Sequence, residues 1–136
     1  LWIGGHSAGA HLCAMLLADP SSPPVAGALL ASGIYDLDPV LNISINAEIQ
    51  AKAEDVAPCS PLHHPPVQKT EVLLTVGADE PFEWQRQTHL YADVASDAGC
   101  VTETVIEAGA NHLGLLFDLR SANSASTQAA LARMKT

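Results

Sequence analysis

Positively charged residues are scarce in this sequence. Its 136 residues include 6 Lys and Arg against 15 Asp and Glu, which gives a formal net charge of −9. An acidic chain repels phosphate backbones and anionic lipid surfaces, so we expect neither a nucleic acid nor a membrane as partner. No apolar run approaches the roughly 18 residues that a membrane-spanning helix requires. The sequence therefore argues against the nucleic-acid-binding and integral membrane classes.

Paired cysteines are also missing. Cys13, Cys59 and Cys100 are odd in number and widely spaced, with no C-x-x-C pair among them. This pattern indicates neither a disulfide framework nor a zinc site, and it suits a reducing compartment. No basic segment followed by an apolar stretch begins the chain, so no signal peptide is visible. We expect a cytoplasmic location and no bound metal.

An initiating methionine is absent, because the chain begins with Leu1. Residues 1–3 have the pattern of the end of a buried strand, so we expect the chain to be a piece of a longer protein. Hydrophobic residues nevertheless make up 48% of it. That share suits a chain with a buried core, and it excludes disorder as a description of the whole.

Short apolar runs alternate with helical patterns, which is typical of an α/β fold with a parallel sheet. We expect strands at residues 1–3, 25–32, 71–77 and 101–106. We expect helices at residues 7–18, 81–99 and 126–135. The predicted architecture is a three-layer αβα arrangement around a mostly parallel sheet.

Residues 33–70 form a long connection that is rich in proline, with a plausible helical pattern only at 47–57. A connection of this length in a compact domain usually carries function or covers a site, so we interpret it as cap-like. Asn46 lies within it and could contact a substrate. A turn-forming asparagine is an equally good interpretation.

Residues 5–9 read Gly-His-Ser-Ala-Gly and match the pattern G-x-S-x-G, between an apolar strand and a helix. A strand that turns sharply into a helix strains its central residue and crowds the neighbours. We therefore expect glycine to be required two positions to either side. The turn would present the Ser7 hydroxyl as a nucleophile and the backbone N–H of Ala8 to a developing oxyanion. The motif predicts a serine-dependent hydrolase.

A serine nucleophile needs a general base, and His112 fits because it follows the late strand at 101–106. We expect it to lie in a loop. The other five histidines are set aside. His6 lies beside the nucleophile and faces away from it, and His11 and His89 lie in helices. His63 and His64 lie in the proline-rich connection.

The acid that orients the base should precede the histidine, since α/β-hydrolases have the order nucleophile, acid, histidine. Asp79 and Glu80 both follow the strand at 71–77. Their adjacency leaves the choice between them open. Either carboxylate could instead interact with the dipole of the helix expected at 81–99.

Further segments resemble the kynurenine formamidase (arylformamidase) branch of the α/β-hydrolases and its bacterial esterase relatives. The narrowest are Ser-Gly-Ile-Tyr-Asp-Leu at 32–37 and Glu-Trp-Gln-Arg-Gln at 83–87, supported by 6–12, 44–46 and 60–61. In that family the acid stands three residues before the Glu of the second block, which implies Glu80 rather than Asp79. Asn111 and Gly114 depart from the family pattern without removing a catalytic group.

The resemblance implies an α/β-hydrolase fold of which this chain is the C-terminal half, with the N-terminal strands missing. A second oxyanion donor would come from a His-Gly-Gly-type loop upstream of the nucleophile. The implied reaction is hydrolysis of N-formyl-L-kynurenine to kynurenine and formate in tryptophan breakdown. The expected partner is a small-molecule substrate, no cofactor is needed, and a homodimer is a possible assembly.

Two other interpretations stay open. A general carboxylesterase acting on small acyl esters would use Ser7, Glu80 and His112 unchanged, and only its pocket would differ. A non-catalytic module of the same fold would bind a ligand or partner. Such modules often lose a member of the triad, whereas all three residue types are present in this chain.

Overall fold

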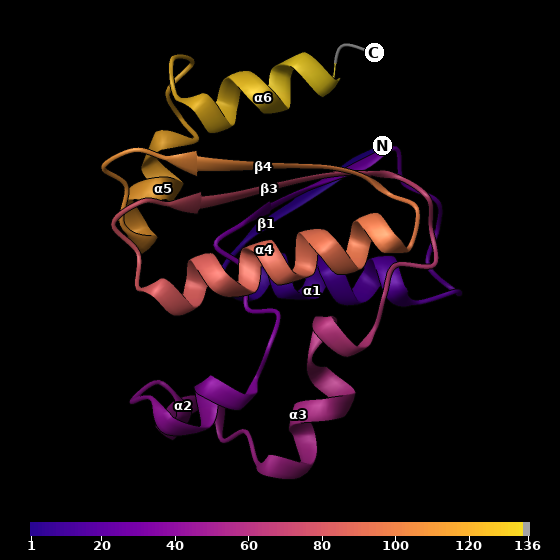
Figure 1. The fold of residues 1–136 in the computed structure, drawn as a ribbon, viewed down its shortest axis with the longest axis vertical. Coiled ribbons are helices and arrows are strands. Elements are labelled where there is room, and N and C mark those ends of the chain that lie inside the picture. The colour runs from indigo at the N-terminus through magenta and orange to yellow at the C-terminus, as the bar shows by residue number, and fades with distance from the viewer. Residues whose placement is uncertain (135–136) are drawn as a thin grey trace.

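The computed structural model describes residues 1–134, which form a four-stranded parallel sheet flanked by helices (Figure 1). The strands are β1 (Trp2–His6), β2 (Gly27–Ala31), β3 (Glu71–Gly77) and β4 (Val101–Glu107), and they lie side by side in chain order. All three neighbouring pairs are parallel, so the carboxyl ends of the strands meet at one edge. The predicted parallel sheet is confirmed.

Helices cover both faces of this sheet. Helices α1 (Ala8–Ala18) and α4 (Phe82–Asp97) lie on one face, and α6 (Ala125–Met134) lies on the other, over β4 (Figure 1). The short helix α5 (His112–Asp118) packs against β3 on the face of α6. The three-layer αβα arrangement is therefore confirmed.

The main hydrophobic core lies between the sheet and the pair α1 and α4. Leu30 and Leu74 are fully buried there, as is Leu17 of α1. The rings of Tyr35 and Tyr91 stack with centroids 4.5 Å apart and join the segment after β2 to α4. Burying a leucine side chain contributes about 2 kcal/mol, so this layer anchors both helices to the strands.

The connection between β2 and β3 contains four short helical segments. They are η1 (Asp38–Asn42), α2 (Asn46–Ile49), α3 (Ala53–Cys59) and η2 (Pro61–His63). The prediction of one helix over 47–57 is wrong. Gln50 adopts a left-handed conformation with φ 58° that ends α2, and α3 begins three residues later.

Other predicted boundaries differ only at their ends. The strand expected at 71–77 has those bounds, and the last helix is described to residue 134, so Lys135 lies outside the described residues. Helix α5 was not predicted, because its seven residues include Gly114 and are too few to show a helical period. Across residues 1–134, no helix has both the length and the apolar character needed to cross a membrane.

Candidate active site

The turn between β1 and α1 has the strained geometry that its motif predicts. Ser7 has φ 56°, and its backbone N–H donates to the carbonyl of Ala31 at 2.9 Å. A Cβ added to Gly5 would lie 2.2 Å from the carbonyl carbon of Gly9, so no larger residue fits at position 5. Apart from its chain neighbours and the nearby backbone of α1, a Cβ on Gly9 would meet no described atom within 4 Å. The requirement for glycine is confirmed at position 5 and is wrong at position 9, because a side chain there would point into open space.

The backbone N–H of Ala8 opens the first turn of α1. No acceptor for this N–H is found among residues 1–134. The four N–H groups at the start of a helix have no partner within it, and the helix dipole adds positive potential there. The N–H of Ala8 can therefore bind a developing oxyanion, as the motif predicts.

A hydrogen-bonded pair of Glu80 and His112 lies at the carboxyl edge of the sheet. Nδ1 of His112 lies 2.7 Å from Oε2 of Glu80, whose side chain is fully buried. Asp79 directly precedes Glu80 but is exposed, and its backbone N–H donates to the carbonyl of Ala110. The structure thus brings Glu80, and not Asp79, to the imidazole. An Nδ1–H that donates to this carboxylate leaves Nε2 of His112 free to act as a base.

Three donors hold the carboxylate of Glu80. Besides His112 on Oε2, the Ser32 hydroxyl and the Gly77 N–H (2.9 Å) donate to Oε1. Burial by itself would raise the pKa of the Glu80 carboxyl, but these hydrogen bonds outweigh it and hold the pKa below its ordinary value. Glu80 is therefore a carboxylate at neutral pH, and it can stabilise a protonated imidazole.

His112 occupies the first position of α5, and not a loop as predicted. Asn111 caps that helix by accepting a hydrogen bond from the Gly114 N–H at 2.8 Å. Nε2 of His6 lies 2.7 Å from the carbonyl oxygen of His112, and the two rings are 4.6 Å apart. The ring of Trp84 meets His112 edge-on at 5.5 Å. No sequence signal links His6 to His112, since the two are 106 positions apart.

Ser7 and His112 line the same cavity, which has a volume of about 540 Å³. Its other lining residues are mostly aliphatic, with one aromatic ring: Ala8, Ile34, Val40, Ile43, Ser44, Ile45, Ile49 and Trp84. The α2 segment of the connection contributes part of this wall. The cavity can therefore hold a largely apolar small molecule against the hydroxyl of Ser7.

Asn46 is not among the residues that line this cavity. Its side-chain oxygen accepts from the Ala51 N–H at 2.8 Å, and its amide nitrogen donates to the carbonyl of Ala51 at 3.1 Å. The amide is thus used to close its own turn. This geometry favours the turn-forming interpretation of Asn46 over a contact with substrate.

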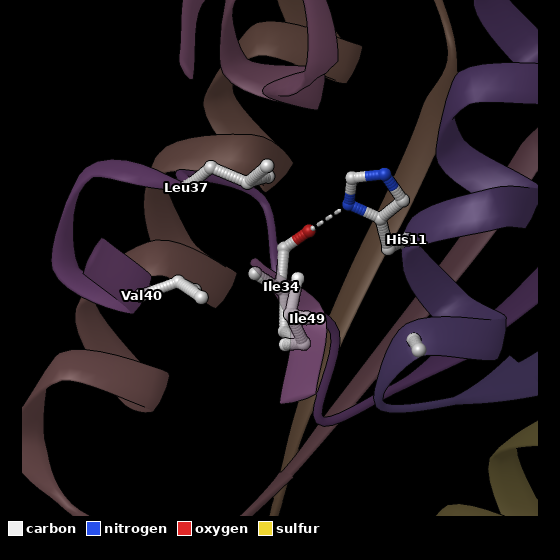
Figure 2. Close-up of a pocket in the computed structure, with 6 residues that line it drawn as sticks. His11, Ile34, Leu37, Val40 and Ile49 are labelled. Atoms are coloured by element: carbon white, nitrogen blue, oxygen red, sulfur yellow. Dashed lines mark hydrogen bonds between the residues drawn. The ribbon is translucent and has the colours of Figure 1, made fainter. Parts of the chain in front are cut away.

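A smaller cavity of about 200 Å³ adjoins the first and shares Ala8, Ile34, Val40 and Ile49 with it. Figure 2 shows it between α1 and the connection, with Nδ1 of His11 bonded at 2.9 Å to the carbonyl of Ile34. His11 therefore fixes the start of the connection against α1. This contact gives His11 a structural role and agrees with its being set aside as the catalytic base.

The two sequence blocks at 32–37 and 83–87 meet in space. The side-chain oxygen of Gln87 accepts from the N–H groups of Tyr35 and Asp36, at 2.8 and 2.9 Å. Arg86 binds Glu83 through two hydrogen bonds of 2.8 and 2.6 Å. Helix α4 thus holds the start of the connection, and with it one wall of the cavity. This contact gives a physical reason for the two blocks to occur together.

The sequence of this chain is similar to parts of known proteins. No protein-family model matches the chain. The chain is 29% identical to the kynurenine formamidase of Danio rerio over 133 residues, which cover 90% of this chain and 45% of that protein. It is 35% identical to the kynurenine formamidase of Salmo salar over 101 residues, which cover 67% of this chain and 34% of that protein. The chain thus spans less than half the length of these curated relatives.

Solved structures share the fold. A proposed thioesterase of Silicibacter sp. TM1040 superposes with a TM-score of 0.73 at 26% identity, over 90% of this chain and 47% of that one. Esterase 2 of Thermogutta terrifontis superposes with a TM-score of 0.59 at 20% identity, over 82% of this chain and 44% of the other. The acylaminoacyl peptidase of Pyrococcus horikoshii gives 0.67 at 19% identity, over 82% and 20%. The chain therefore has the α/β-hydrolase fold, and its sequence resembles those of kynurenine formamidases.

Proposed function

We propose that this chain carries the nucleophile, acid and base of a serine hydrolase that cleaves the formyl amide of N-formyl-L-kynurenine. The observation that carries the proposal is the Glu80–His112 pair beside the strained turn that holds Ser7. The similarity to kynurenine formamidases supports the choice of substrate. We also propose a cytoplasmic location, in keeping with three free cysteines, and a homodimer as the assembly to be tested.

Acylation would begin when Nε2 of His112 takes the hydroxyl proton of Ser7 as Ser7 Oγ attacks the formyl carbon. The carbonyl oxygen becomes an oxyanion and accepts a hydrogen bond from the Ala8 N–H. The buried carboxylate of Glu80 stabilises the imidazolium through Nδ1. The imidazolium then gives its proton to the arylamine nitrogen, the C–N bond breaks, and kynurenine leaves.

Deacylation would reverse the proton movements. Water attacks the formyl ester on Ser7 while His112 accepts a proton from it. The second tetrahedral intermediate collapses, Ser7 recovers its proton from the imidazolium, and formate leaves. An arylamine is expelled more easily than an alkylamine, so the same groups should also cleave activated aryl esters.

A carboxylesterase acting on small acyl esters is the second candidate function. The aliphatic lining of the Ser7 cavity favours it, because five of the lining residues are isoleucine or valine and offer no polar group to a formyl amide. Several of the solved structures that share the fold are also esterases. Both functions would use the same three residues, so only the substrate separates them.

The test compares turnover of N-formyl-L-kynurenine with that of short p-nitrophenyl esters by the full-length protein. We expect cleavage of both, with the higher kcat/KM on the formyl amide. Good ester cleavage without amide cleavage would replace the formamidase proposal with the esterase one. Labelling with a fluorophosphonate probe tests the third interpretation. A folded protein that stays unlabelled, or that labels equally well after Ser7→Ala, would point to a non-catalytic module.

A further inference from the structure

Ser32 lies directly after β2, at the edge of the sheet where β1, β3 and β4 also end. It is fully buried, and its backbone has φ 46°. This left-handed region favours glycine, yet the glycine of this turn is the next residue, Gly33, and a serine holds the strained position. The contacts of the Ser32 side chain should therefore explain why a serine holds this strained backbone conformation.

The hydroxyl of Ser32 donates to Oε1 of Glu80. Its backbone N–H donates to the carbonyl of Thr75 at 2.8 Å, so the residue is also held by β3. The Gly77 N–H is the other donor to Oε1, at 2.9 Å. With Oε1 held by two donors from neighbouring strands, the carboxylate cannot rotate freely, and Oε2 is left facing His112.

We propose that Ser32 is a positioning residue for the Glu80–His112 pair, and that its strained backbone is the means by which β2 delivers a hydroxyl to the carboxylate. This inference rests on the proposed serine hydrolase function. A glutamate side chain has one more torsion than an aspartate and so needs more restraint to present one oxygen to an imidazole. Ser32 and Gly77 supply that restraint from one side, and His112 supplies it from the other.

The charged and titratable surroundings of Glu80 are few. Among residues 1–134, the titratable group bonded to its carboxylate is His112 of α5, which His6 of β1 contacts in turn. The groups that reach Glu80 from the other elements are neutral: Ser32 after β2, the Gly77 N–H in β3, and Gln85 of α4, whose amide donates to the Glu80 carbonyl. Loss of the Ser32 donor should therefore act on the Glu80–His112 pair.

Two variants separate positioning from folding. Ser32→Ala removes the hydroxyl and keeps the strained backbone, whereas Ser32→Gly removes the hydroxyl and relieves the strain. We expect both to lower kcat about tenfold to a hundredfold, the size typical for loss of a hydrogen bond to a charged group. We expect the thermal midpoint of Ser32→Gly to equal or exceed that of Ser32→Ala. If Ser32 acted only through stability, the better folded Ser32→Gly would keep the activity that Ser32→Ala loses.

The pH response gives a readout that a structural role would not move. The Ser32 hydroxyl is one of the donors that hold the pKa of the Glu80 carboxyl below its ordinary value, and a carboxylate that has lost a donor binds a proton more tightly. The Glu80 carboxyl, followed by carbon NMR in the full-length protein and assigned with Glu80→Gln, should therefore titrate at higher pH in Ser32→Gly. The acid limb of kcat/KM should move in the same direction.

The outcomes are distinct. An unchanged Glu80 titration and an unchanged kcat in Ser32→Gly would overturn the role of Ser32, even if Ser7→Ala abolished turnover and so upheld the proposed function. A shifted titration of the Glu80 carboxyl in a protein that cleaves neither ester nor amide would uphold the contact of Ser32 with the Glu80–His112 pair. It would overturn the proposed function instead.

Discussion

A single methyl group added at Gly5 should disrupt the site, because the backbone of α1 leaves no room for it. The Cβ of an alanine there would lie 2.2 Å from the Gly9 carbonyl carbon, 2.4 Å from its oxygen and 2.7 Å from the Ala10 nitrogen. All three are backbone atoms of α1, so no side chain can rotate away. The helix would have to retreat by roughly 1 Å to reach the 3.4 Å at which ordinary contact begins.

We therefore expect Gly5→Ala to cost about 3 kcal/mol of unfolding free energy, the upper part of the range for overpacking. A shift of about 1 Å at the start of α1 also displaces Ser7 and the Ala8 N–H, which should lower kcat about a hundredfold. Urea unfolding and ester turnover of the full-length protein measure the two effects.

Gly9→Ala is the matched control, since its Cβ meets no described atom within 4 Å and it lies within α1. Alanine in a helix is favoured over glycine by about 0.5–1 kcal/mol, so this variant should be as stable as the parent or slightly more so. Equal stability and equal activity of the two alanine variants would refute the steric account of the turn.

Three further predictions concern buried polar contacts. Hydrogen bonds lower the pKa of Glu80 in the folded state. The ionised Glu80 side chain therefore stabilises the fold above the ordinary carboxyl pKa, and this stabilisation is lost as the pH falls through the lowered pKa. The stability gap between the parent and Glu80→Gln, measured by urea unfolding, should therefore close below about pH 4.5, and a gap independent of pH would contradict this. Gln87→Leu leaves two backbone N–H groups without an acceptor, so it should lower the free energy of unfolding by about 2 kcal/mol. It should also raise KM more than it lowers kcat, and unchanged steady-state kinetics would contradict this prediction. Glu107 accepts three hydrogen bonds at the start of α6, so Glu107→Gln should lower the unfolding free energy by about 1–3 kcal/mol, whereas the exposed Glu54→Gln should leave it nearly unchanged.

Local features of this chain could be predicted because their causes are local. The turn at Ser7 was predicted from an apolar strand, two glycines and a helix within a dozen residues, although only Gly5 of the two glycines is required by the packing. The strand β3 was placed at its observed bounds because a run of seven mostly apolar residues suits a strand that is buried on both faces. Helix α5 and the break at Gln50 were missed because a seven-residue helix and a single left-handed residue leave no periodic signal.

The choice between Asp79 and Glu80 shows where reasoning from spacing ends. The family resemblance implied Glu80, but no pattern within the chain distinguishes two adjacent carboxylates. Their difference arises after β3, where the Glu80 N–H donates to the Gly77 carbonyl and the Asp79 N–H donates to that of Ala110. This turn leaves Asp79 exposed and buries Glu80 beside His112. The catalytic roles of both partners stay predictions that the experiments above test.

The sequence by itself determined the parallel α/β architecture, the position of the strained serine and the order of the candidate residues. Each of these depends on hydrophobic period, glycine placement or chain order, which are properties of neighbouring residues. Only the tertiary structure decided that Ser32 and Gly77 hold one oxygen of Glu80, and that His6 contacts His112 from 106 positions away. The physical reason is that parallel strands far apart in the chain end at one edge of the sheet, where side chains meet whose separation along the sequence carries no signal.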